Sequence, residues 1–142
     1  MRLTQHTDHA LRVLMYLGAN EGRLATTGEG RLATTGEVAA RYGISHHHLT
    51  KVVNRLGHAG FVETVRGRSG GIRLARAPAE IMVGDVVRRT EPAFDVAGCP
   101  GGRAGACPLA PDCVLKGALC GAAARFLEAL DDVPLSSLIG AA

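Results

Sequence analysis

Residues 37 to 56 read Glu37-Val-Ala-Ala-Arg-Tyr-Gly-Ile-Ser-His-His-His-Leu-Thr-Lys-Val-Val-Asn-Arg-Leu56 and predict two short helices. The first helix stops at Gly43, because glycine takes up the left-handed backbone conformation that ends many helices. Ser45 is placed to cap the second helix with its hydroxyl oxygen. Two short helices joined by a tight glycine-containing turn are typical of a helix-turn-helix. One face of the second helix is apolar and consists of Leu49, Val52, Val53 and Leu56.

A basic, glycine-rich segment follows these helices. Phe61-Val-Glu-Thr-Val65 and Ile72-Arg-Leu74 have the pattern of two short strands, with Arg66-Gly-Arg-Ser-Gly-Gly71 between them as a turn. A basic hairpin directly after a helix-turn-helix is typical of the wing in a winged-helix DNA-binding module. We therefore expect a mainly α-helical fold with a small β wing, and double-stranded DNA as its partner.

The candidate DNA contacts lie on the second helix and on the wing. A recognition helix enters the major groove by its N-terminal residues, and wing arginines meet phosphates or the minor groove. A solvated basic hairpin without DNA contacts is the alternative for the wing. Three consecutive histidines also suggest a metal site, but consecutive helical side chains diverge by about 100° and cannot converge on one ion. The predicted DNA-binding residues are Ser45, His46, His47, His48, Lys51, Arg55, Arg66, Arg68 and Arg73.

A first helix precedes the helix-turn-helix. Apolar residues from Thr7 onward recur with helical period, and Thr7 or Asp8 is placed to cap the helix. Asp8 and Arg12 are four residues apart, so their side chains can pair on the helix surface.

An octapeptide repeat follows that helix. Glu21-Gly-Arg-Leu-Ala-Thr-Thr-Gly28 recurs residue for residue at 29–36. Two copies are too few for a solenoid. We interpret 21–36 as a tandem duplication that lengthens the first interhelical loop, where extra residues cost little. Thr34 or Thr35 of the second copy is placed to cap the next helix.

The chain divides at Pro78 into a DNA-binding head, 1–77, and a second part, 78–142. The second part contains a short predicted helix from Ile81 to Thr90, a long helix from about Pro111 to Asp131 and a final turn at 134–139. Little else in the chain can cover the apolar stripe of the long helix, so we expect it to pack against its copy in a homodimer. That stripe consists of Leu115, Leu119, Ala122, Phe126 and Leu130.

Charge is distributed unevenly over the 142 residues. Residues 1–76 carry eleven Lys and Arg against five Asp and Glu, whereas 77–142 carry five against eight. All six histidines also lie in the first part. The first part therefore suits a polyanion.

All four cysteines lie within residues 99–120. Cys99 and Cys107 are each followed by proline, and glycines between them allow the backbone to fold tightly around a bound group. Clustered thiolates of this kind hold iron-sulfur clusters. A structural zinc site, a disulfide pair and simple neighbouring thiols are the alternatives.

The sequence carries no signal for secretion or membrane insertion. Its early apolar run, Leu14-Met15-Tyr16-Leu17, is too short, and no stretch reaches membrane-spanning length. We expect a cytoplasmic protein without a membrane partner, whose reduced thiols favour metal over a disulfide. We find no nucleophile–base pair, phosphate loop or carboxylate pair in a supporting context, so we do not expect an enzyme.

Several stretches together resemble the Rrf2 family of winged-helix regulators. The resemblance covers nearly the whole chain and is closest to the family's nitric-oxide-sensing repressors, the NsrR group. It rests on the opening residues 1–12, Tyr42-Gly-Ile-Ser-His46, Arg66-Gly-Arg-Ser-Gly-Gly-Ile-Arg-Leu74, Gly84-Asp-Val-Val87 and Cys107-Pro-Leu-Ala-Pro-Asp-Cys113-Val-Leu115.

The resemblance implies one 4Fe-4S cluster per subunit, with nitric oxide as the signal that releases operator DNA. Its ligands would be Cys99, Cys107, Cys113 and the partner subunit's Asp8. A carboxylate is a hard ligand beside soft thiolates, so that position would be the most easily displaced. Asp8 acting only as a helix cap is the alternative. Cys120 is excluded, since seven helical residues place it about 10.5 Å from Cys113 along the axis.

Two features of the sequence bear on the type of cluster. The seven residues between Cys99 and Cys107 exceed the spacing of the family. Relatives with a 2Fe-2S cluster use a histidine three residues after the last cysteine, where this chain has Lys116. The alternatives are a 2Fe-2S sensor of redox or iron-sulfur status, a small electron-transfer module in the cysteine half, and a zinc-stapled protein that binds DNA constitutively.

Overall fold

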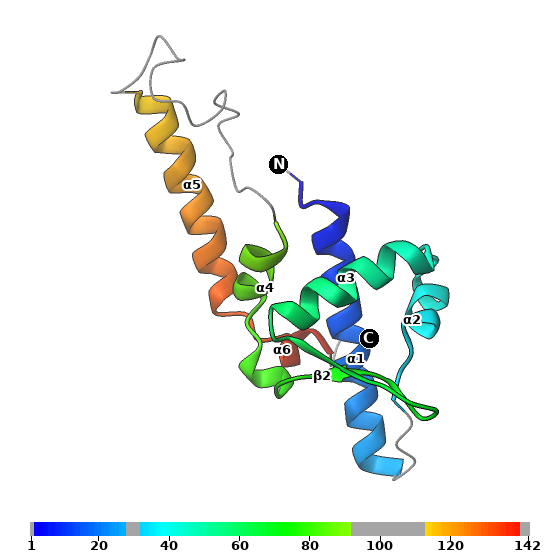
Figure 1. Cartoon of the computed structure of the whole chain (residues 1–142). Coiled ribbons are helices and arrows are strands. Elements are labelled where there is room, and N and C mark those ends of the chain that lie inside the picture. Colours follow the sequence, from blue (N-terminus) through cyan, green and yellow to red (C-terminus); the bar gives the residue numbers. More distant parts are fainter. Residues whose placement is uncertain (1, 28–31, 92–112, 140–142) are drawn as a thin grey trace.

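A computed structural model describes residues 2–27, 32–91 and 113–139 of the chain, and in 22–27 the backbone alone (Figure 1). The expected mainly helical fold with a small β wing is confirmed. The elements are α1 (Gln5–Thr27), α2 (Thr35–Tyr42), α3 (His46–His58), β1 (Val62–Val65), β2 (Gly71–Leu74), the 3₁₀ helix η1 (Pro78–Glu80), α4 (Val83–Thr90), α5 (Val114–Asp131) and α6 (Leu135–Ile139).

The helix-turn-helix forms as its capping residues predict. Thr34 caps α2: its Oγ1 accepts a hydrogen bond from the Glu37 amide at 3.2 Å, and its own amide donates to Glu37 Oε2 at 2.8 Å. Gly43 ends α2 with φ of 64°, in the left-handed region. Ser45 then caps α3 by accepting from the His48 amide at 3.3 Å. The turn between α2 and α3 is therefore fixed by the left-handed Gly43 and by the Ser45 cap.

One hydrophobic core joins the head to the C-terminal elements. The four residues predicted for the apolar face of α3 are all buried. Ile81, Val86 of α4 and Leu135 of α6 belong to the same core. Backbone hydrogen bonds from Val83 N to Val133 O, 2.9 Å, and from Leu135 N to Ile81 O, 2.8 Å, hold the last elements in place. The division at residue 77 thus lies within a shared core, and it stays a prediction about function.

The wing is an antiparallel hairpin of β1 and β2 in which Glu63 lies opposite Arg73. Its turn includes Gly67, whose φ of 118° favours glycine. Ile72 N donates to Ala33 O at 2.7 Å, so the residues before α2 add a bridge to the hairpin. The wing is therefore attached to the helix-turn-helix by backbone bonds, and it extends away from the core (Figure 1).

The first octapeptide copy is not a loop. Residues 21–27 continue α1, so the loop expectation is wrong for this part of 21–36, while 28–31 lie outside the described residues. Glu, Arg, Leu and Ala in the copy are good helix formers and can extend a helix that already exists. Glu21 also ties α1 to the wing, because its Oε1 accepts from Leu74 N at 3.1 Å.

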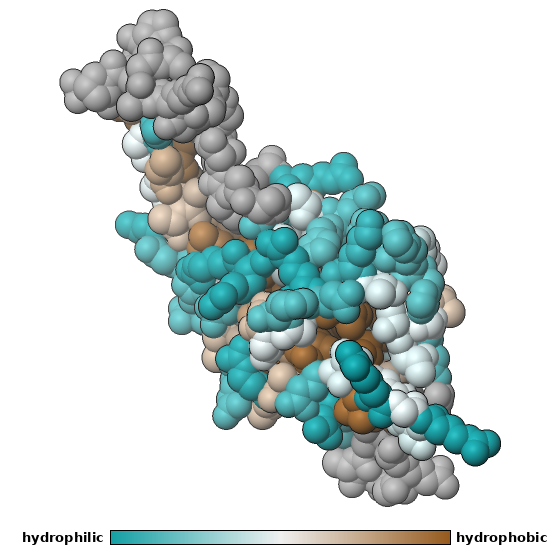
Figure 2. Space-filling view, in the orientation of Figure 1, coloured by the Kyte–Doolittle hydropathy of each residue, from teal (hydrophilic) through white to brown (hydrophobic). Residues whose placement is uncertain are grey.

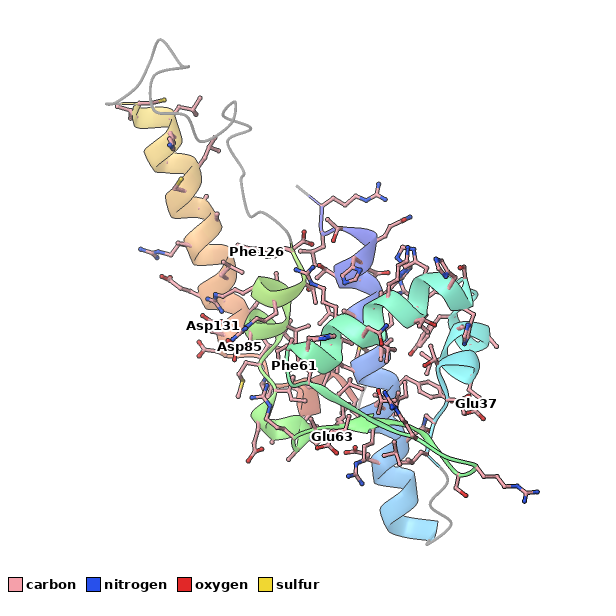
Figure 3. All side chains as sticks on the ribbon, viewed as in Figure 1. Glu37, Phe61, Glu63, Asp85, Phe126 and Asp131 are labelled. Atoms are coloured by element: carbon pink, nitrogen blue, oxygen red, sulfur yellow. The ribbon has the colours of Figure 1, made fainter. Side chains whose placement is uncertain are left out.

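The long helix predicted from about Pro111 is confirmed as α5, with 111–112 outside the described residues. It meets the head near its C-terminal end, where Arg88 of α4 holds Asp131 through two hydrogen bonds, one of 2.7 Å between Nη2 and Oδ2 (Figure 3). A Cβ at Gly84 would collide with the Asp131 carboxylate, so only glycine fits there. The Arg88 bonds hold the pKa of Asp131 below its usual value.

Much of α5 is exposed within one subunit. Of its residues only Ala123 is buried, while Val114 and Leu115 are 86% and 64% exposed. Leu119, Phe126 and Leu130 of the predicted stripe are half-buried, and Ala122 is exposed. Apolar residues are visible along this helix where it stands away from the head (Figure 2). A homodimer that covers α5 stays a prediction.

A chain with a single octapeptide copy is expected to fold as the full chain does. One copy supplies both anchors: its first residue takes the place of Glu21, and its fifth and sixth take the places of Ala33 and Thr34. Glu21 bonds Leu74 and Ala33 bonds Ile72, so the two anchors contact β2 at positions two residues apart. In the shortened chain three residues lie between the anchors, and they are long enough to connect these two positions. Deleting 21–28 or 29–36 gives the same sequence. We expect the free energy of unfolding in urea to change by less than about 1 kcal/mol.

A larger decrease in the free energy of unfolding, or unfolding that is no longer cooperative, would show that the extension of α1 itself stabilises the head. The variant Gly84→Ala is the positive control in this assay. Its new Cβ displaces Asp131, so its midpoint is expected to fall.

Candidate nucleic-acid interface and metal ligands

The recognition helix presents a basic face to solvent. His46, His47, Lys51 and Arg55 are exposed; Lys51 lies opposite the buried face of α3, and Arg55 lies on the flank toward α4. Figure 2 shows hydrophilic residues gathered over this part of the molecule. These side chains are free to meet the edges and phosphates of a DNA groove.

His48 lies differently from its two neighbours. It is half-buried, and its ring packs edge-on against His9 of α1 with centroids 5.0 Å apart, and near His6 at 6.5 Å. Burial lowers the pKa of His6 and of His9, and the positive charge of Arg55 lowers that of His6 further. His48 therefore connects the recognition helix to the first turns of α1.

Sequence reasoning missed His6 and His9 as partners of the recognition helix. Their spacing of three residues places them on one face of a helix, which is the signal that was available. Which other helix that face meets depends on the tertiary packing.

The three wing arginines are not equivalent. Arg66 and Arg68 are exposed and make no ion pair with any residue that the structure describes. Arg73 pairs with Glu63 across the strands, with Nη2 and Oε2 2.9 Å apart. Two wing cations are therefore available to an anionic partner, and the third is already paired.

Asp8 is exposed on the first turns of α1 and does not cap the helix. Thr4 takes that role, since its Oγ1 accepts from Thr7 N at 3.3 Å. The carboxylate of Asp8 instead accepts from Arg12 Nε at 2.8 Å. Arg12 in turn lies over the ring of Tyr42 in α2, 5.7 Å from its centroid. The capping alternative for Asp8 is wrong. Its half-exposed carboxylate lies at the surface, where a group from outside the subunit can reach it.

The start of α1 is also tied to the start of the cysteine segment. Thr4 donates from its amide to Glu91 Oε1 at 2.7 Å and from its hydroxyl at 3.2 Å. Glu91 is the last described residue before 92–112.

Cys113 caps α5 with its sulfur, which accepts from Lys116 N at 3.4 Å. A cysteine sulfur binds metal as the thiolate. This donor fits an iron-sulfur cluster or zinc. Cys99 and Cys107 lie outside the described residues. Cys120 is exposed further along the helix, and Lys116 is exposed in the first turn.

Within the described ranges, no group of three His, Cys, Asp or Glu is close enough to hold a metal ion. The start of α5 stands well apart from the start of α1 in Figure 1, so Cys113 and Asp8 of one subunit are not brought together. No described helix is long and apolar enough to cross a membrane.

Comparison with known proteins places the whole chain in one family. The model of the Rrf2 family, described as an iron-dependent transcriptional regulator, matches residues 3–141. The HTH-type transcriptional regulator NsrR of Geobacillus kaustophilus is 44% identical over 139 residues, which cover 98% of this chain and 90% of the relative. NsrR of Bacillus subtilis is 42% identical over 140 residues, covering 98% and 90%.

Solved structures share the fold. CymR, the global cysteine regulator of B. subtilis, superposes with a TM-score of 0.72 at 22% identity, covering all of this chain and 98% of CymR. IscR of T. potens gives a TM-score of 0.71 at 25% identity, covering 99% and 87%. Because the family model and the NsrR relatives both match nearly the full chain, this protein belongs to the Rrf2 family of winged-helix transcriptional regulators.

Proposed function

We propose that this regulator is an iron-sulfur-dependent repressor that senses nitric oxide and then releases operator DNA. The observation that carries the proposal is its near-full-length similarity to regulators named NsrR, in a chain with a thiolate and a carboxylate at the starts of two helices. The proposed setting is the cytoplasm, where thiols stay reduced.

Cys99, Cys107, Cys113 and the partner subunit's Asp8 would hold one 4Fe-4S cluster per subunit. When bound, the cluster supplies iron that reacts with nitric oxide. The exposed Asp8 carboxylate is a hard donor and is the ligand most easily replaced. Its use by a second subunit is supported by the separation of the starts of α1 and α5 within one subunit (Figure 1).

Asp8 has two competing partners in this scheme. In the free subunit it pairs with Arg12, which also contacts Tyr42 of the helix-turn-helix. Engagement of Asp8 by the other subunit would break the pair with Arg12, and its release would restore that pair. The contact between His9 and His48 then carries a shift of this turn to the recognition helix.

A dimer through α5 would set the distance between the two recognition helices. Its exposed apolar residues and the single subunit's lack of cover for them support this arrangement. Two recognition helices read successive major grooves only when they lie about 34 Å apart. A coupling of about 1 to 3 kcal/mol between cluster and operator would change operator affinity by roughly 5- to 150-fold.

The second candidate is a sensor with a 2Fe-2S cluster. IscR regulators are the family members that the resemblance associates with a 2Fe-2S cluster, and IscR of T. potens is 25% identical to this chain. Lys116 argues against it, because an ammonium group cannot ligate iron in place of histidine. Metal analysis also separates either cluster from a zinc-stapled, constitutive DNA-binding protein.

The two described cysteines provide a matched test of the metal site. Cys113→Ser is expected to lose bound iron and visible absorbance after anaerobic purification, because it removes a thiolate at a helix N-terminus. Cys120→Ser is expected to keep both. Iron and zinc are measured per subunit by elemental analysis. Equal iron in the two variants, or zinc in place of iron in the unmodified protein, would contradict the assignment.

The wing arginines provide a test of DNA binding. Arg68→Gln removes one phosphate contact per subunit, so the log–log salt slope of a dimer should become shallower by about 1.8. The charge-neutral double variant Glu63→Gln, Arg73→Gln removes an existing ion pair and is expected to leave the slope unchanged. Fluorescence anisotropy at several salt concentrations measures both slopes. If the slope becomes as shallow in the double variant as in Arg68→Gln, Arg73 also contacts phosphate.

A further inference from the structure

A cleft of about 570 Å³ lies between the start of α1, the second half of α3 and the end of α4. None of the described residues that line it is acidic. The lining residues are His6 from α1, Lys51, Arg55, His58 and Ala59 from α3 and its end, and Arg89 from α4. Three permanent cations and two histidines thus surround one open space.

One cation of this cleft is held in place by a hydrogen bond, and none of the three forms an ion pair with a described residue. Arg55 Nε donates to the backbone oxygen of Arg89 at 3.1 Å, which fixes the guanidinium at the wall. Neither Lys51 nor the side chain of Arg89 forms an ion pair with a described residue. The nearby carboxylate of Glu91 accepts hydrogen bonds from Thr4 and keeps its charge close to His6. The described lining of the cleft itself carries three cations and no carboxylate.

Two histidines also border this space. His58 Nδ1 donates to Asn54 O at 2.7 Å, because a carbonyl oxygen can only accept. That bond fixes the ring beside the cleft. The Nε2 atom of His6 is buried and has no hydrogen-bond partner among the described residues.

The position of the cleft on α3 indicates the source of the anion. Lys51 and His58 lie on the exposed face of the recognition helix, and Arg55 lies on the flank that turns toward α4. The major groove is about 12 Å wide, close to the diameter of a helix with its side chains. A helix in the groove therefore has a phosphate backbone along each flank, and this cleft lies on one flank.

We propose that this cleft holds a backbone phosphate of bound DNA, and that Arg89 of α4 is a DNA contact outside the helix-turn-helix and wing. The inference rests on the proposed DNA-regulatory function. It adds α4 to the DNA interface, the helix that also carries Asp85 and Arg88 at the junction with α5. Arg89 supplies charge and bidentate geometry to the phosphate without reading sequence.

The test is Arg89→Gln in the full chain, with a mixed-sequence duplex about three helical turns long as the probe. The substitution keeps the backbone oxygen that Arg55 uses, and the side chain is exposed, so the fold should persist; circular dichroism checks this. The matched control is Arg125→Gln, which removes the same charge from an 85% exposed side chain on α5.

We expect Arg89→Gln to make the log–log salt slope of a dimer shallower by about 1.8. It should also weaken binding to operator DNA and to mixed-sequence DNA by the same factor. Arg125→Gln should leave the slope unchanged. Equal slopes for Arg89→Gln and the unmodified protein, or a loss confined to the operator, would overturn the assignment.

A small phosphate compound is the other source of the same chemistry. If Arg89→Gln leaves DNA binding unchanged but abolishes saturable binding of inorganic phosphate, followed by phosphorus NMR at constant ionic strength, the cleft holds such a compound and the DNA assignment is wrong. Binding to mixed-sequence DNA needs neither cluster nor nitric oxide. If Arg89→Gln leaves DNA binding unchanged while the unmodified protein binds the duplex, only the phosphate site in the cleft is wrong. If the unmodified protein binds no duplex, the proposed function is wrong as well.

Discussion

Burial of one face of α1 is the interaction on which the rest of the structure depends. Ala10, Val13, Leu14 and Leu17 are at most 2% exposed, and burying each of the three larger side chains contributes roughly 1.5 to 3 kcal/mol. Along its length the helix contacts α3, α4, β2 and α6. Its first turns carry Asp8 and touch the recognition helix, and Glu21 holds the wing. A displacement of α1 would therefore move both the recognition helix and the wing.

Local sequence signals predicted the helix-turn-helix because its energetics are local. Gly43 and the hydroxyls of Thr34 and Ser45 act on their own neighbours, so their roles follow from spacing. The long exposed helix α5 follows from periodicity in the same way. The Rrf2 membership, stated first as a resemblance, is confirmed by the family match.

The features that sequence did not predict are those set by tertiary contacts. The first octapeptide copy extends α1, because an existing helix is lengthened at little cost, and no local pattern marks that choice. Strand register places Arg73 opposite Glu63, a pairing that depends on how the hairpin closes. The packing of α1 against α3 brings the His48 ring against His9, although His48 stays a predicted DNA contact. Arg89 joins Lys51 only through the fold.

The most direct test of the central claim is a stepwise nitric oxide titration of the anaerobic protein, with visible absorbance and operator binding followed on the same sample. The operator is the duplex that the unmodified protein selects from random DNA. The account predicts that absorbance of an iron-sulfur cluster changes in step with a roughly 5- to 150-fold loss of operator affinity. A colourless protein, or one whose operator affinity is unchanged after the cluster has reacted, would contradict it.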